Sequence, residues 1–113
     1  MKLLDLIVDI SHQVLNKQNK YLSPGHNGPY NDRETPVRNK GHWLITLSRL
    51  FQITNDLRYL NLIVNLADYL CSHESRPYGY SFHHRLKEGK DKCNGLIGQA
   101  WTFEALAYAS LVT

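Results

Sequence analysis

The chain has 113 residues, of which 42% are hydrophobic and 20% are charged, and its formal net charge is +3. This composition excludes an intrinsically disordered chain, and the length allows one small domain over residues 1–113. The basic residues are scattered along the sequence rather than gathered in a stripe, so nucleic acid is not an expected partner.

The N-terminal segment is apolar, but Asp5 and Asp9 interrupt it, which is not typical of a signal peptide. No apolar run approaches the roughly 18 residues that a membrane-spanning helix needs. We therefore expect a cytoplasmic protein in which Cys71 and Cys93 are free thiols, although the sequence alone leaves a disulfide open.

Four stretches carry apolar residues at helical spacing and predict an all-α fold. They are Leu3–Asn16, Lys40–Thr54, Asp56–Cys71 and Asn94–Leu111. The third is preceded by Asn55 and opens at Asp56, both favourable helix N-caps. The last two are apolar over more than half of their circumference and should be covered on two sides. We predict that the four helices form two antiparallel helix pairs.

The connections between these helices are unequal. The second and third helices are separated by only a few residues around Asn55, so they should be antiparallel neighbours. Two long segments, Lys17–Asn39 and Ser72–Cys93, lead into the second and fourth helices, and structureless loops of that length are usually functional or disordered. In an up-down array both loops end at the same end of the bundle, so the unusual polar residues should gather there.

The second long loop has the alternation of a short strand. Tyr78–Arg85 alternates in the manner of a half-buried strand, and Lys87–Lys90 contains a glycine that suits a turn. We therefore predict a small β-hairpin in this loop.

Two sequence stretches resemble the repeats of an α/α toroid. One is Arg38-Asn39-Lys40-Gly41-His42-Trp43 with the following Leu47-Ser48-Arg49-Leu50-Phe51-Gln52-Ile53-Thr54-Asn55-Asp56 and Tyr59-Leu60; the other runs from Asn94-Gly95-Leu96-Ile97-Gly98-Gln99-Ala100-Trp101 to Glu104-Ala105-Leu106. The pattern is similar to the six-hairpin glycosidase-like superfamily. That superfamily includes unsaturated glucuronyl hydrolases, sugar epimerases and helical domains of polysaccharide lyases.

The resemblance implies a carbohydrate-directed protein, a segment of an enzyme that processes uronic acid glycans. This chain holds about two of the six hairpins of a toroid, so it is either part of a longer chain or completes its fold as a homo-oligomer. The alternative is a non-catalytic helical interaction or scaffold domain. The residues do not decide whether the chain is catalytic.

Asp32 and Glu34 are the candidate catalytic residues, because glycoside hydrolysis uses paired carboxylates on either side of the scissile bond. Residues two positions apart in an irregular loop need not face each other. Hydrogen bonding within the loop is the more common role for such carboxylates.

The candidate substrate-binding residues combine cationic and aromatic side chains near the two long loops, and they are His26, Tyr30, Arg38, His42, His83 and Trp101. Arginine forks match carboxylates, so an anionic oligosaccharide is the expected ligand. His42 follows the start of the second helix, where the helix dipole favours bound anions. Histidines that cap helices and a tryptophan that packs in the core are the alternative interpretations.

We expect no metal and no cofactor. The sequence has no CxxC or HExxH motif. Where the toroid-shaped lanthionine cyclases have a zinc-binding Cys-His-Gly run, Asn94 stands in the place of the histidine. Gly95-Leu96-Ile97-Gly98 lacks the lysine and hydroxyl residue of a phosphate loop, so its glycines are better explained by close packing.

Overall fold

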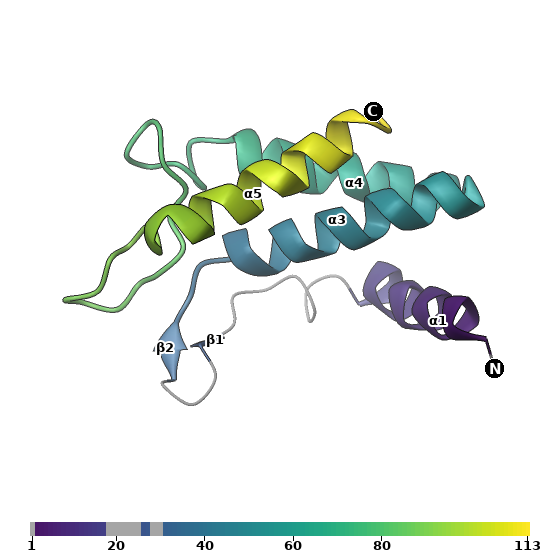
Figure 1. The fold of residues 1–113 in the computed structure, drawn as a ribbon, viewed down its shortest axis with the longest axis horizontal. Coiled ribbons are helices and arrows are strands. Elements are labelled where there is room, and N and C mark those ends of the chain that lie inside the picture. The colour runs from purple at the N-terminus through teal and green to yellow at the C-terminus, as the bar shows by residue number, and fades with distance from the viewer. Residues whose placement is uncertain (1, 18–25, 28–30) are drawn as a thin grey trace.

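A computed structural model describes residues 2–17, 26–27 and 31–113 of the chain (Figure 1). Four helices in this part hold more than half of all residues: α1 (Leu3–Asn16), α3 (Val37–Thr54), α4 (Leu57–Cys71) and α5 (Gly95–Ser110). The prediction of a mostly helical domain with four helices is confirmed, and the predicted bounds of α1 match those observed.

The α3–α4 hairpin forms as the sequence predicts. Asn55 ends α3 in the left-handed conformation, with φ of 55°. Asp56 then caps α4, and its side chain accepts a hydrogen bond from the backbone N–H of Arg58 at 3.0 Å. The two helices are antiparallel neighbours because this two-residue link leaves no room for another arrangement.

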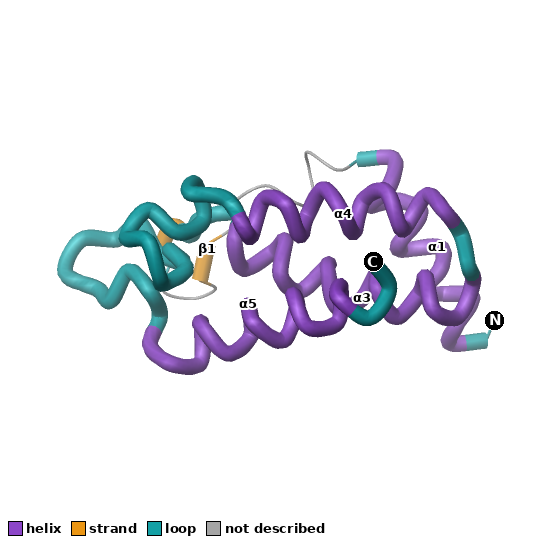
Figure 2. The backbone as a smooth tube through the Cα atoms, turned by 90° about the horizontal axis from the view of Figure 1, so that it is seen from above, coloured by secondary structure: helices purple, strands orange, loops and turns teal. Residues whose placement is uncertain are grey.

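The third partner in the bundle, α5, lies beside α3 and runs in the same direction (Figure 1). Seen from above, α4 and α5 lie next to each other over α3 (Figure 2). The buried face of α5 is formed by small residues, and a Cβ added to Gly41 of α3 would lie 3.9 Å from the Cβ of Ala105. Small side chains therefore let the two backbones approach closely.

The prediction of two antiparallel helix pairs holds in part. The described residues form one antiparallel hairpin, α3–α4, and α5 packs mainly on α3, in parallel, and less on α4. Helix α1 makes few contacts with α4 and still fewer with α3 and α5. The reason is that α1 buries few side chains, since only Ser11 and Val14 are fully covered.

The core lies between α3, α4 and α5, with one residue from α1 and one from the second long loop. Its apolar members are Val14, Val37, Leu44, Leu47, Leu50, Tyr59, Leu62, Ile63, Leu66, Leu70, Phe82, Ala105 and Ala109.

The predicted β-hairpin in the second long loop is wrong. Gly89 makes a turn with φ of 73°, but the backbone N–H groups of His84 and Arg85 both donate to one carbonyl, that of Lys92, instead of forming a ladder. The extended backbone of this loop pairs with the first loop, where Arg85 and Glu34 form an antiparallel bridge. The two short strands of the described residues are in the first loop, where β1 (His26–Asn27) pairs antiparallel with β2 (Asp32–Arg33).

Candidate functional site

The two long loops meet at the end of the bundle where α3 and α5 begin (Figure 1). The backbone N–H of Thr35 donates to the carbonyl of His84 at 2.9 Å, and that of Leu86 donates to the carbonyl of Arg33 at 3.0 Å. The Thr35 hydroxyl also donates to the carbonyl of His83. This junction fixes polar side chains from both loops beside the two helix N-termini.

Two carboxylates, Asp32 and Glu34, are buried at this junction, with 4% and 6% of their surface exposed. Each pairs with a different cation: Lys87 Nζ lies 2.7 Å from Asp32 Oδ1, and Arg38 Nη1 lies 2.6 Å from Glu34 Oε1. The hydrogen bond from Lys87 lowers the pKa of Asp32, so this carboxyl is ionised at neutral pH and accepts hydrogen bonds only. The structure thus places the two carboxylates in separate ion pairs.

Three of the predicted binding residues come together between α3 and α5. Arg38 and His42 lie one turn apart on α3, and both face Trp101 of α5. The Arg38 Cζ atom lies 5.8 Å from the centre of the indole ring, and the His42 and Trp101 ring centres are 5.6 Å apart with their planes tilted by 54°. Burial and the nearby Arg38 lower the pKa of His42, which keeps this imidazole neutral at neutral pH.

His84 lies beneath these side chains and is 2% exposed. Its Nε2 atom is 3.2 Å from the Thr102 hydroxyl, which in turn donates to the carbonyl of Gly98 at 3.0 Å. A Cβ on Gly98 would come within 3.2 Å of the His84 ring and 2.7 Å of a backbone oxygen, so only glycine leaves room for this packing. The interpretation of the α5 glycines as packing residues is confirmed for Gly98.

We define the α3–α5 cluster as Glu34, Arg38, His42, His84 and Trp101. A hollow of about 10 Å³ lies inside it, which is close to the space of one water molecule. Its lining consists of Val37, Arg38, Gly41, His42, His84, Trp101 and Thr102.

The remaining predicted residues are outside this cluster or outside the described residues. His83 turns toward its own loop, where its Nε2 lies 2.7 Å from the carbonyl of Arg85 and its ring packs edge-on against Tyr78. Only the backbone of His26 is described, in β1, and Tyr30 lies outside the described residues.

His84 and Thr102 were not among the candidates chosen from the sequence. The alternating pattern of Tyr78–Arg85 could have indicated His84. Phe82 and His84 are both 2% exposed, whereas His83 between them is half-buried, so the alternation marks which side chains of this loop point inward. Thr102 lies one residue after Trp101 on the buried stripe of α5. An ordinary threonine inside a helix gives no chemical signal.

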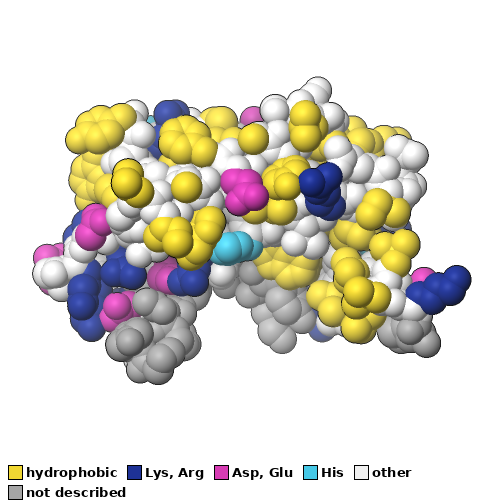
Figure 3. All heavy atoms as spheres, viewed as in Figure 1, with side chains coloured by type: hydrophobic (Ala, Val, Ile, Leu, Met, Phe, Trp, Pro, Cys, Tyr) yellow, Lys and Arg dark blue, Asp and Glu magenta, His cyan; other side chains and the backbone are white. Residues whose placement is uncertain are grey.

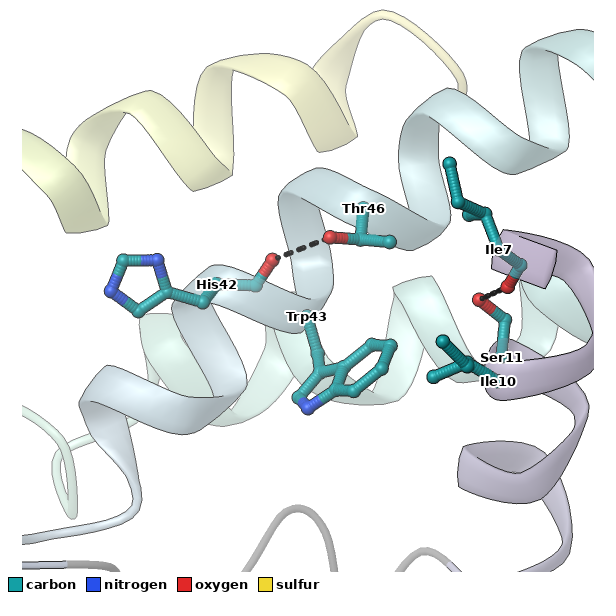
Figure 4. Close-up of a pocket in the computed structure, with 6 residues that line it drawn as sticks. All are labelled: Ile7, Ile10, Ser11, His42, Trp43 and Thr46. Atoms are coloured by element: carbon teal, nitrogen blue, oxygen red, sulfur yellow. Dashed lines mark hydrogen bonds between the residues drawn. The ribbon is translucent and has the colours of Figure 1, made fainter. Parts of the chain in front are cut away.

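A second hollow of about 350 Å³ lies between α1 and α3 (Figure 4). The indole of Trp43 extends from α3 toward Ile10 of α1, and the His42 ring points to the other side (Figure 4). The hydroxyls of Ser11 and Thr46 donate to backbone carbonyls within their own helices, at 2.8 and 3.3 Å, which leaves the walls mainly apolar. His42 borders both hollows.

Comparison with known proteins gives one informative match. The chain is 47% identical over 96 residues to Archaeal glycosylation protein Q of Haloferax volcanii. The match covers 85% of this chain and 26% of that protein, so the chain spans about a quarter of the length of its relative. No protein-family model and no solved structure matches the chain.

Among residues 2–17, 26–27 and 31–113, no three His, Cys, Asp or Glu side chains are grouped so that they could hold a metal ion. In the same part of the chain, every helix is too short or too polar to cross a membrane.

Proposed function

We propose that the chain is a segment of a carbohydrate-directed protein and that the α3–α5 cluster binds an anionic sugar of the uronic acid class. The observation that carries the proposal is the meeting of Arg38, His42 and Trp101 at the shared N-terminal end of two long helices. The 47% identity to a protein named for glycosylation supports a carbohydrate ligand, as does the resemblance to α/α toroids.

The cluster has the groups that such a sugar needs. Glu34 engages one terminal nitrogen of Arg38, and a guanidinium has five N–H donors, so donors remain for a ligand carboxylate. The exposed part of Trp101 offers an aromatic face of the kind on which sugar rings stack. The N-termini of α3 and α5 add a positive potential that favours an anion.

Glu34 is the better of the two proposed catalytic carboxylates. It belongs to the cluster through Arg38, whereas Asp32 is held by Lys87. A role for Glu34 in proton transfer requires the ligand to displace its ion pair with Arg38, because Arg38 Nη1 already occupies the Oε1 oxygen of this carboxylate. In the ligand-free protein the pair orders the loop in front of α3.

The test is a titration with D-glucuronate and D-galacturonate, read by calorimetry, on Arg38→Ala and Arg58→Ala. Both arginines pair with a carboxylate, Glu34 at 2.6 Å and Asp56 at 2.7 Å, but Arg58 belongs to α4 and lies outside the cluster. Loss of Arg38 should weaken binding about 10- to 150-fold, the equivalent of about 1.5–3 kcal/mol for hydrogen bonds to charged groups. Arg58→Ala should bind like the wild type, and equal losses in both variants would contradict the proposal.

A second candidate is a non-catalytic interaction domain that associates with a second copy of itself. The outer face of α5 favours it, because Leu96, Phe103 and Leu111 are 89%, 59% and 68% exposed. Soluble domains rarely leave a large apolar patch uncovered. This candidate predicts no uronate binding, and so the titration separates the two functions.

A further inference from the structure

One face of the junction between the two long loops carries charged side chains from both loops. Glu34 and Arg85 lie opposite each other in an antiparallel bridge, and the hydrogen bonds run between the residues on either side of them. Side chains in such a non-hydrogen-bonded pair point to the same face, with Cβ atoms about 4.5–5.5 Å apart. The ion pair between Asp32 and Lys87 follows the same register two residues further along. The side chain of Arg85 therefore starts beside that of Glu34, a member of the α3–α5 cluster.

Within the described part of the chain, Arg85 forms no ion pair. The carboxylates of Glu34 and Asp32 are held by other cations, at 2.6 and 2.7 Å. Both oxygens of Asp91, a third carboxylate near Arg85, accept hydrogen bonds from backbone N–H groups around the start of α5. The positions outside the described ranges contain no Asp or Glu. Arg85 therefore has no carboxylate partner in the chain and can pair with an anion from outside it.

Arg85 and Arg38 approach the same buried ring from two different segments. Burial lowers the pKa of His84, and the positive charges of Arg38 and Arg85 lower it further, so both guanidinium groups lie close enough to act on this imidazole. Both arginines are also open to solvent in part, since 34% of the Arg38 side chain is exposed and Arg85 is half-buried. A dissolved ligand therefore meets two neighbouring arginines at this end of the bundle.

We propose that Arg85 is a second carboxylate-binding residue of the site, and that the ligand is an oligosaccharide with at least two uronic acids, one held by Arg38 and the next by Arg85. This inference rests on the proposed function. A guanidinium binds one carboxylate through a pair of N–H donors, so two arginines match two carboxylates. Glu34 lies beside both cations and offsets their mutual repulsion. A single uronate leaves Arg85 without a partner.

The test compares D-galacturonate with digalacturonate in calorimetric titrations of the full chain. The wild type should bind digalacturonate about 5- to 30-fold more tightly, the gain expected for one further ion pair that is partly exposed. Arg85→Ala should lose this gain and should bind D-galacturonate within about 2-fold of the wild type. Lys90→Ala is the matched control, because it removes one positive charge from an exposed position of the same loop, and it should bind both sugars like the wild type.

Thermal unfolding checks that the variants are folded, and Arg85→Gln, which keeps most of the apolar stem, repeats the test if Arg85→Ala is not. Equal affinities of the wild type for the two sugars, or equal losses in Arg85→Ala and Lys90→Ala, would overturn the inference and leave the proposed function intact. Inorganic phosphate that binds as tightly as digalacturonate would also overturn it, because the two arginines would then hold one compact dianion. Failure of the wild type to bind either sugar would remove both proposals.

Discussion

At the scale of single residues, His84 and His42 are the side chains whose charge state matters most. Burial lowers the pKa of both imidazoles, with Arg38 adding to the effect at His42. An unfolded chain binds a proton at these residues near the ordinary histidine pKa of about 6.5, so the unfolded state holds more protons just below that pH. Acidification therefore favours unfolding.

We predict that the free energy of unfolding falls as the pH is lowered from about 7.5 to about 5.5, and that His84→Gln reduces this dependence. Carboxyl groups with a lowered pKa affect stability in a separate and more acidic pH range. The hydrogen bond from Arg58, for example, lowers the pKa of Asp56 from 3.8 to about 2. Urea unfolding at a series of pH values measures the effect. A pH-independent free energy between about 7.5 and 5.5 would show that folding does not lower the pKa of these two imidazoles.

At the scale of helices, the sequence predicts the features that depend on neighbouring residues, such as helix caps. Asp56 caps α4 as expected, since an Asp before an apolar helical stretch has that role in most contexts. The sequence predicts that α3 starts at Lys40, but the helix begins at Val37. Thr35-Pro36 carried the signal: the Thr35 hydroxyl accepts from the backbone N–H of Val37 at 3.3 Å, and proline favours the first turn of a helix.

The parallel packing of α5 on α3 could not be predicted in the same way. It brings together Gly41 and Ala105, which are 64 residues apart in the chain. The backbone pairing of Glu34 with Arg85 could not be predicted either. An extended segment can pair with any other extended segment that the tertiary structure brings near. For this reason the sequence predicts a hairpin within the second loop, whereas the structure pairs that loop with the first one.

The close approach of these helices gives a stability prediction. Ala105→Leu inserts a large side chain into a position that is 0% exposed and should destabilise the fold by about 1–3 kcal/mol. Ala107→Leu, on the exposed side of the same helix, is the matched control and should change stability by less than about 0.5 kcal/mol. Urea unfolding compares the two, and a neutral Ala105→Leu would show that α5 does not pack on α3 in this way.

At the scale of the whole molecule, apolar side chains cover much of one face. On the face in Figure 3, Lys, Arg, Asp and Glu side chains are densest at the loop end, and hydrophobic side chains lie over α5 and α1 with single charged side chains between them. In α1, Leu3, Leu6 and Ile10 are 73%, 44% and 44% exposed. Exposed apolar surface of this extent is typical of a face that packs against another part of a protein or against a second molecule.

We predict that the isolated 113-residue chain is at least a dimer at tens of micromolar, because association covers the apolar faces of α1 and α5. Light scattering coupled to size exclusion measures the mass. Phe103→Lys, on the exposed face of α5, should shift the chain toward monomer. A monomeric wild type at that concentration contradicts this expectation without touching the sugar proposal.

The most direct test of the central claim uses the two tryptophans of the chain, because they lie in different places. Trp101 belongs to the α3–α5 cluster, and Trp43 borders the apolar hollow between α1 and α3. A proton–nitrogen spectrum of the labelled chain shows both indole N–H signals, and a Trp43→Phe variant assigns them. We predict that D-glucuronate shifts the Trp101 signal in a saturable manner and leaves the Trp43 signal in place. An unchanged Trp101 signal at saturating sugar, or a shift of Trp43 alone, would contradict the account.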